Sequence, residues 1–387
     1  MNIAFRGIAK RLCVVVALTV LTSYSCSSPR AAKVQEMWRD QIDLLKAYCL
    51  VITVDHLGHS FFGSDIAVGD YSIERESSAV IEVLDELEID KASVVGLSLG
   101  GMVALHLAIS YPQRIEKLVV VASAPKLGRR EDWKSRAQLV RNEGTRALVN
   151  GLSERWFSPS TIASRPNVVA AAEAMVESIS DEGYARCAEM IGACDLSNEL
   201  YKITSPTLII GGSLDKVAPP ETLFDLSSKI EGSHLVVVGG ANHILNLDAP
   251  ESFNAELSNF ILGSNFERGD RKRRAVLGDS YVDASNARIN DFNRSFFRYV
   301  TEVPWGNFWT RGVLDAKTRS IVTLSLLLAS HLLEEFEIHL RGGINNGLSA
   351  DELSEIMMQA IPYIGVPRVL SAMKVVARVL SEDRSKW

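Results

Sequence analysis

The chain has 387 residues, of which 47% are hydrophobic and 23% charged, so it is long enough for two globular domains. Its net charge of −6 provides no basic field for nucleic acid, and only the short run ERGDRKRR at 267–274 is markedly basic. The five cysteines are odd in number and irregularly spaced, which is neither a disulfide framework nor a CxxC metal or redox pair. This pattern favours a reducing compartment.

The first 35 residues allow two interpretations. Arg6, Lys10 and Arg11 precede an apolar run at 12–22, which is typical of a signal peptide and too short to span a bilayer. The β-branched content of LCVVVALTVL is equally typical of a buried strand. Export and retention in the cytoplasm are both open on this observation.

Strand and helix patterns alternate from about residue 48 onward. Strands are predicted at 49–55, 92–98, 115–124, 206–215 and 233–243. Helices are predicted at 73–89, 100–111 and 250–262. Residues 126–200 lose strand character and predict several further helices. This order predicts a mostly parallel sheet covered by helices, with the helical insertion forming a lid over its active edge.

A polar, charged stretch at 262–274 predicts a domain boundary, and no convincing strand follows it. Helical patterns occur at 315–330, 332–347 and 349–365. Ser349 and Glu352 predict a capping box at the start of the last of these helices. We therefore expect an atypical segment at 1–35, an α/β domain at 36–263 with its lid at about 126–200, and an all-α domain at 264–387.

The residues GLSLG at 96–100 match the G-x-S-x-G nucleophile elbow. In that motif a strained turn between a strand and a helix raises the serine oxygen above the sheet edge, and here a strand pattern precedes Ser98 and a helical pattern follows it. A strand-to-helix turn that is merely rich in glycine is the alternative. The sequence predicts that Ser98 is a nucleophile and that the Leu99 amide is an oxyanion donor.

A serine hydroxyl needs a base to take its proton and an acid to orient that base. Asp215 ends one predicted strand and His243 follows another, in the chain order Ser, Asp, His of α/β-hydrolases. Each residue alone is also typical of a turn or a surface loop. Both together, in this order and at strand ends, predict a triad of Ser98, Asp215 and His243.

Several segments resemble 3-oxoadipate enol-lactonases of the α/β-hydrolase fold over about residues 36–262. They include GLSLGGMVALHLA, RWFSPS, PTLIIGGSLDKVAPPE, NHILNLDAPESFNAELSNFI and, from the lid, DEGYARCAEMIGACDL. The resemblance implies that Ser98 attacks a lactone carbonyl and that water then hydrolyses the acyl-enzyme to 3-oxoadipate. Trp156, in the RWFSPS segment, is a candidate substrate contact.

The resemblance departs from the family pattern before residue 36. Family members have a strand that ends in an NSLG-like or HG-like loop, which supplies one of two oxyanion-hole amides, whereas this chain has VLTSYSCSSPRAAKVQEMW. Losing one such donor typically lowers the rate by on the order of a hundred- to a thousand-fold. The first 35 residues are expected to be an unusual replacement or a faulty start, and an inactive hydrolase half is an alternative.

Two features of the helical region are candidates for a second site. Glu335 and His339 are four residues apart on one helix face, so the carboxylate can orient the imidazole and raise its basicity. Trp305 and Trp309 precede Arg311, and aromatic walls beside a guanidinium suit a small planar carboxylate. A solvated ion pair and buried core aromatics are the alternative explanations.

The segments RRAVLGDSYVDAS, EVPWGNFWTRGVLDAKTRS and EEFEIHLRGGINNGLSADELSEIMMQAIPYIGVP resemble 4-carboxymuconolactone decarboxylase over about residues 272–382. The resemblance implies an all-α, oligomeric domain that uses no cofactor or metal. His339 matches the active-site histidine, and Glu335 stands where relatives have an acid or a cysteine. No cysteine follows Cys194, so thiol redox chemistry is excluded for this helical domain.

The product of that decarboxylase is the substrate of the lactonase, so the chain looks like a bifunctional fusion of protocatechuate degradation. In this assignment His339 delivers a proton and Glu335 orients the imidazole. Arg311 anchors a carboxylate of the substrate, beside Trp305 and Trp309. We expect lactone substrates, no nucleic acid, homo-oligomers formed through the C-terminal domain, and a cytoplasmic location unless the first residues direct export. The alternative is a generic serine esterase whose helical tail only oligomerises.

Overall fold

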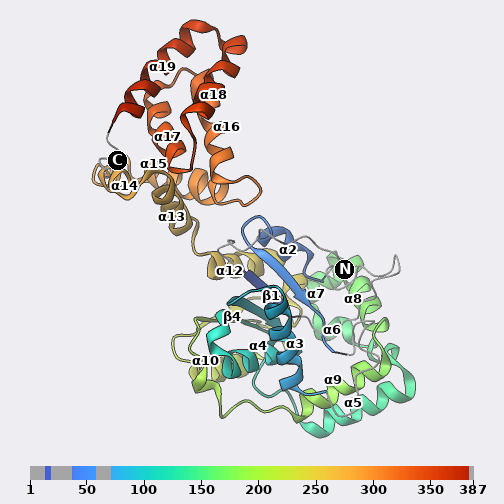
Figure 1. The fold of residues 1–387 in the computed structure, drawn as a ribbon. Helices are drawn as coiled ribbons and strands as arrows, with labels where there is room; N and C mark the ends of the chain where they lie inside the picture. The colour runs from blue at the N-terminus through green and yellow to red at the C-terminus, as the bar shows by residue number, and fades with distance from the viewer. Residues whose placement is uncertain (1–13, 19–36, 58–70, 383–387) are drawn as a thin grey trace. The chain divides into compact units, whose positions relative to one another are not determined.

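The computed structural model describes residues 14–18, 37–57 and 71–382 (Figure 1). The chain divides into two compact units, Met1–Ile261 and Leu262–Trp387. Within the described residues the first unit is built of a sheet and helices and the second of helices alone, which confirms the predicted fold class. None of the described helices is both long enough and apolar enough to cross a membrane.

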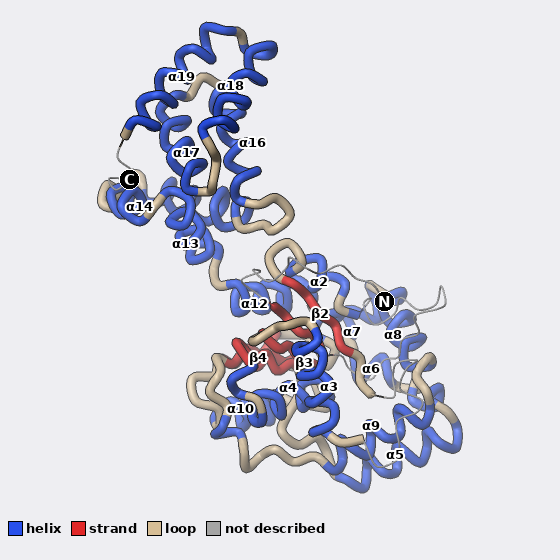
Figure 2. The backbone as a smooth tube through the Cα atoms, in the orientation of Figure 1, coloured by secondary structure: helices blue, strands red, loops and turns tan. Residues whose placement is uncertain are grey.

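Six parallel strands form the centre of the first unit, red in Figure 2, in the order β2-β1-β3-β4-β5-β6. They are β1 (Val14–Leu18), β2 (Leu50–Val54), β3 (Ala92–Leu97), β4 (Ile115–Val121), β5 (Thr207–Gly212) and β6 (His234–Val238). Every residue of β3 and β5 is buried, as expected for parallel strands that are covered on both faces. The five strands predicted after residue 48 are all present.

Strand β1 lies within the first 35 residues of the chain. It pairs with β2 on one side and β3 on the other, and Val16 is aligned with both Ile52 and Val94. The strand interpretation of the early apolar run is therefore correct for residues 14–18. The missing oxyanion loop was predicted for the residues that follow this strand. Residues 19–36 lie outside the described residues, so that prediction stays open.

Helices cover both faces of this sheet. Trp38, α2 (Arg39–Leu45) and α12 (Pro250–Leu262) pack on one face, where Leu45 and Leu257 lie close to Val15 and Val95. On the other face lie α3 (Ile73–Glu86), α4 (Leu99–Ser110) and α10 (Pro220–Ser228) (Figure 1). Helix α4 is buried from Leu99 to Ile109, because it is apolar on all sides and runs through the centre of the unit.

Between β4 and β5 the chain forms a helical insertion. Its helices are α5 (Arg130–Glu143), α6 (Leu152–Trp156), α7 (Pro159–Ser164), α8 (Pro166–Glu177) and α9 (Asp181–Ala193). Helices α5 and α9 are joined by Arg141, which binds the carboxylates of Glu182 and Glu189. Short turns of helix complete the unit: η2 (Pro112–Arg114), η3 (Thr145–Leu148), η4 (Leu200–Lys202) and α11 (Leu245–Asp248).

The second unit packs helices around an apolar core that includes Leu324, Phe336, Leu340 and Leu353. The helices are α13 (Asn265–Leu277), α14 (Asp279–Asn286), α15 (Arg294–Val300), the π-helix η5 (Thr301–Trp309), α16 (Ala316–Ala329), α17 (Leu333–Asn345), α18 (Ala350–Ile364) and α19 (Val366–Ser381). The predicted capping box of Ser349 and Glu352 is present.

The polar stretch at 262–274 is not an irregular linker. Ser264 and Glu267 form a capping box that starts α13. Gly269 allows this helix to approach η5, because a Cβ atom at that position would lie 1.9 Å from the carbonyl oxygen of Thr301. The basic composition that suggested a boundary therefore belongs to a packed helix of the second unit.

Candidate active sites

Ser98 lies in a strained turn between β3 and α4. Its φ of 55° and ψ of −115° fall in a region that side chains rarely adopt. A Cβ atom at Gly96 would lie 2.0 Å from the Gly100 carbonyl oxygen, so the close approach of strand and helix requires glycine there. The turn is held by the Ser98 amide, which donates to the Val121 carbonyl at 2.9 Å, and by the Ser123 hydroxyl, which donates to the Ser98 carbonyl at 2.6 Å.

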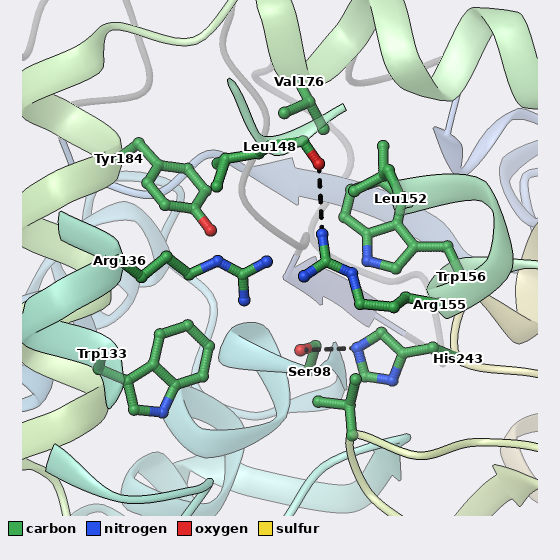
Figure 3. A pocket seen from close by; sticks show the side chains of 11 residues that line it. Ser98, Trp133, Arg136, Leu148, Leu152, Arg155, Trp156, Val176, Tyr184 and His243 are labelled. Atoms are coloured by element: carbon green, nitrogen blue, oxygen red, sulfur yellow. Dashed lines mark hydrogen bonds between the residues drawn. The ribbon is translucent and has the colours of Figure 1, made fainter. Parts of the chain in front are cut away.

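The three residues predicted to form a triad lie in one hydrogen-bonded chain. Ser98 Oγ is 3.1 Å from His243 Nε2, and His243 Nδ1 is 2.8 Å from Asp215 Oδ2 (Figure 3 shows the first of these bonds). The other oxygen of Asp215 accepts the amides of Val217 and Ala218 at 2.7 and 3.2 Å. All three side chains are buried, so the arrangement can pass the serine proton to an oriented imidazole.

The ends of β5 and β6 bring the acid and the base together. At Gly212 a Cβ atom would lie 2.3 Å from the Ala241 carbonyl oxygen, so the loop carrying His243 can touch the end of β5 only where glycine stands. The Leu99 amide is the first N–H of helix α4, and no residue in the described part of the chain accepts it. It is therefore available to an oxyanion beside Ser98.

Two arginines of the helical insertion reach this site. Figure 3 shows Arg136 of α5 and Arg155 of α6 extending toward each other next to Ser98 and His243. Neither guanidinium forms an ion pair with a described acidic residue; Arg155 donates to the Leu148 carbonyl at 3.3 Å. Burial lowers the pKa of Arg155, and the like charge of Arg136 lowers it further. The remaining wall of the cavity consists of Trp133, Leu148, Leu152, Trp156, Val176, Tyr184 and Val217.

The sequence did not single out these arginines, although it did single out Trp156. Arg136 follows Trp133 by three residues on one face of α5, and its guanidinium carbon lies 5.6 Å from the centre of that indole ring. This spacing of a tryptophan and an arginine on one helix face is the local signal that would have identified Arg136.

In the second unit His339 lies beside the two predicted tryptophans. Its ring centre is 6.0 Å from that of Trp305 and 6.2 Å from that of Trp309, and the three rings are nearly parallel. The two indoles stack at 4.9 Å. Trp305 is buried, and the π-helix η5 brings both indoles to the face of α17 that carries His339.

The other two predicted residues of this site lie differently. Glu335 is exposed one turn before His339, and no hydrogen bond joins the two side chains in the described structure. Arg311 is also exposed, and its carbonyl accepts the Arg319 guanidinium at 2.8 Å. The charge of Glu335 nevertheless acts on His339, and the expected orientation of the imidazole by Glu335 stays a prediction.

The half-buried position of His339 among the indoles sets the protonation of its imidazole. It lowers the pKa of the imidazole to about 4, while the charge of Glu335 acts in the opposite direction. Glu335 does raise the pKa of this histidine, as expected. The loss of solvent around the imidazole lowers the pKa by more than Glu335 raises it. At neutral pH the side chain is a neutral imidazole.

We expect His339 to titrate near pH 4 in the free protein, against 6.5 for an ordinary histidine. The unfolded chain takes up this proton at higher pH, so the contribution to folding stability is complete above about pH 6.5 and is lost as the pH falls toward 4. Histidine NMR titration, assigned with His339→Gln, checks the value. Glu335→Gln should lower the pKa further, and a wild-type midpoint near 6.5 would contradict the buried environment.

The sheet, the strained serine turn and the Ser98–His243–Asp215 hydrogen bonds define the first unit as an α/β domain of the serine hydrolase class. Residues 27–256 match the Alpha/beta hydrolase family, and residues 294–378 match the Carboxymuconolactone decarboxylase family. The chain belongs to the alpha/beta hydrolase family and carries a domain of the carboxymuconolactone decarboxylase family fused after it.

Relatives of each half are known separately. The 3-oxoadipate enol-lactonase 2 of Acinetobacter baylyi is 35% identical over 56% of this chain and 80% of its own length. The 4-carboxymuconolactone decarboxylase of the same organism is 36% identical over 30% of this chain and 87% of its own length. The crystal structure of the enol-lactonase from Burkholderia xenovorans superimposes with a TM-score of 0.59 and 30% identity, over 65% of this chain and 91% of that one.

Proposed function

We propose that the chain catalyses two successive reactions, the decarboxylation of 4-carboxymuconolactone and the hydrolysis of the resulting 3-oxoadipate enol-lactone to 3-oxoadipate. The pair of arginines beside Ser98, neither of which forms an ion pair with a described acidic residue, is the observation that carries this proposal. Each of the two lactones bears carboxylate, and a guanidinium binds that group with charge-assisted hydrogen bonds.

In the hydrolase site Ser98 attacks the lactone carbonyl while His243 takes its proton. The ring C–O bond then breaks, and the leaving enol oxygen takes the proton from His243 before the enol tautomerises to a ketone. The acyl group stays on Ser98 until water, activated by the neutral His243, releases it. Asp215 holds the imidazolium, and the Leu99 amide donates to the oxyanion. Arg136 and Arg155 orient the substrate through its carboxylate, and Trp156 contacts its apolar side.

In the second unit His339 delivers the proton that replaces carbon dioxide. The bond to the leaving carboxylate breaks, its electron pair enters the unsaturated lactone, and a proton adds to the ring carbon next to the lactone carbonyl. A neutral imidazole beside a bound carboxylate gains a proton more easily, because the opposite charge stabilises the imidazolium. Glu335 assists through its charge, Trp305 and Trp309 form the wall, and Arg311 is the proposed carboxylate anchor.

We propose further that copies associate through the second unit. Large apolar side chains of α16, α18 and α19 are exposed, among them Leu326, Met358, Tyr363, Val366 and Leu370. A groove between α16 and α18 is lined by Ile321, Ile356 and Ala360. Such a contiguous apolar surface favours association. The role in aromatic degradation supports a cytoplasmic location.

The arginine pair is tested by charge selectivity. We expect the wild type to prefer 4-nitrophenyl hydrogen glutarate, which ends in a carboxylate, over the neutral 4-nitrophenyl valerate. Arg136→Ala or Arg155→Ala should lower the ratio of the two kcat/KM values by about 10- to 100-fold, as expected for a lost hydrogen bond to a charged group. Ser98 and His243 are unchanged in these variants, so the neutral ester should be hydrolysed at nearly the wild-type rate.

Arg129→Ala is the matched control, because Arg129 also belongs to the insertion but is exposed and paired with Asp132. Its ratio should equal that of the wild type. An unchanged ratio in both pocket variants would contradict carboxylate recognition and would favour a generic esterase.

A further inference from the structure

Asn242 precedes His243 and joins its loop to the helical insertion. Its side-chain Nδ2 donates to two carbonyls of the segment containing α6, those of Glu154 and Phe157, both at 3.0 Å. Arg155 and Trp156 stand between these two carbonyls and line the cavity beside Ser98. Both amide hydrogens of Asn242 are therefore used to hold the backbone that presents the substrate-facing side chains.

The other end of this amide is unsatisfied. Asn242 is 5% exposed, and its buried Oδ1 has no hydrogen-bond partner among the described residues. An orphaned buried acceptor costs free energy that an apolar side chain of similar size would not. The position thus uses asparagine for its two donors, although its acceptor is left unpaired.

Further hydrogen bonds fasten the same two segments. One oxygen of Asp248 accepts the Asn242 amide at 2.6 Å, and the other accepts the amide and the hydroxyl of Ser158 at 3.0 and 2.8 Å. The Ile244 amide donates to the Trp156 carbonyl at 3.1 Å. The loop of the base and the segment of Arg155 therefore form one hydrogen-bonded piece.

We propose that Asn242 is a positioning residue, which fixes the distance between Arg155 and the Ser98–His243 pair and so sets the selectivity for substrates that bear a carboxylate. The inference rests on the proposed role of Arg155. Asn242 touches neither the serine nor the substrate. It acts by holding the main chain on both sides of Arg155, so that the guanidinium meets the carboxylate when the ester carbonyl is at Ser98.

Asn246 provides the control that distinguishes a positioning role of Asn242 from a purely structural one. Asn246 lies four positions further on, in α11, is 0% exposed and donates through Nδ2 to the Met37 carbonyl at 2.6 Å. Its Oδ1 also has no partner among the described residues. It does not line the cavity. Asn246→Ala therefore reproduces the loss of a buried amide next to this loop without disturbing the segment of Arg155.

The test measures the kcat/KM ratio of the carboxylate ester to the neutral ester in the full-length chain. Asn242→Ala is expected to lower the ratio about tenfold, mainly through a higher KM for the charged ester, while Asn246→Ala leaves it unchanged. Asn242→Ser, which cannot reach both carbonyls, should also lower the ratio and serves if the alanine variant does not fold. The double variant Asn242→Ala/Arg155→Ala should have the ratio of Arg155→Ala alone.

Three results would contradict the role of Asn242 itself. These are an unchanged ratio in both Asn242 variants, an equal fall in Asn246→Ala, or a double variant whose loss is the product of the two single losses. If Arg155→Ala itself leaves the ratio unchanged, the proposed recognition by Arg155 fails and the inference fails with it. If Arg155→Ala lowers the ratio and the Asn242 variants do not, only the role of Asn242 is wrong.

Discussion

Replacing Ser98 by alanine should lower the rate of enol-lactone hydrolysis by on the order of 10⁵-fold. The structure gives the reason, because Ser98 Oγ is the hydroxyl bonded to His243, which is in turn bonded to buried Asp215. Without that oxygen no acyl-enzyme forms, and only the background from binding and the oxyanion donor is left. The measurement is the disappearance of enol-lactone after subtraction of its spontaneous opening.

The same variant should decarboxylate 4-carboxymuconolactone at the wild-type rate, since His339 belongs to the other compact unit. A fluorophosphonate probe should label the wild type and not Ser98→Ala. Hydrolysis within tenfold of the wild type, or labelling of the variant, would show that another residue is the nucleophile.

Replacing His339 by alanine should lower the decarboxylation rate by on the order of 10³-fold, which is the contribution expected of a positioned proton donor. His339 is the titratable side chain held beside the stacked indoles of Trp305 and Trp309. Release of carbon dioxide from 4-carboxymuconolactone measures the effect. His339→Gln should be similarly slow, because it preserves polarity but cannot exchange a proton at the imidazole position.

The matched control is His234→Ala, which removes an exposed histidine at the start of β6. It should leave decarboxylation unchanged, and His339→Ala should leave enol-lactone hydrolysis unchanged. A His339→Ala variant that releases carbon dioxide at the wild-type rate would remove the proton-delivery role from this residue.

The residues of the hydrolase site were predictable because the fold class fixes where strand ends meet. Ser98, Asp215 and His243 each lie at the carboxyl end of a predicted strand, and the carboxyl ends of parallel strands lie at one edge of a sheet. The order of the three along the chain, together with the position of His243 in a loop after a strand, then favoured this histidine. The distances between them were not predictable, since they depend on the contact between Gly212 and the loop of His243.

The contacts that reach across the chain could not be predicted in the same way. Asn242 bonds to residues more than eighty positions away, and nothing in its local sequence indicates that partner. Arg136 and Arg155 come from an insertion whose helices have no fixed place in the sheet pattern. The pKa of His339 also escaped prediction, because a helix-face pattern gives the charge beside a histidine but not its burial.

The two ends of the first domain differ in how clearly the sequence marks them. Strand β1 has only 5 residues, and its apolar, β-branched sequence is also typical of the apolar part of a signal peptide. At the other end, the polar stretch marked the boundary but not the helix that begins there, and the capping box at Ser264 and Glu267 was the local signal for that helix.

The most direct test of the two-reaction account supplies purified full-length protein with 4-carboxymuconolactone and measures its products over time. The account predicts release of carbon dioxide and rapid formation of 3-oxoadipate by the wild type, and accumulation of the enol-lactone with Ser98→Ala. Enol-lactone that accumulates equally in both samples would contradict the hydrolase half. Starting material that stays unchanged would contradict the decarboxylase half, and with it the proposed sequence of reactions.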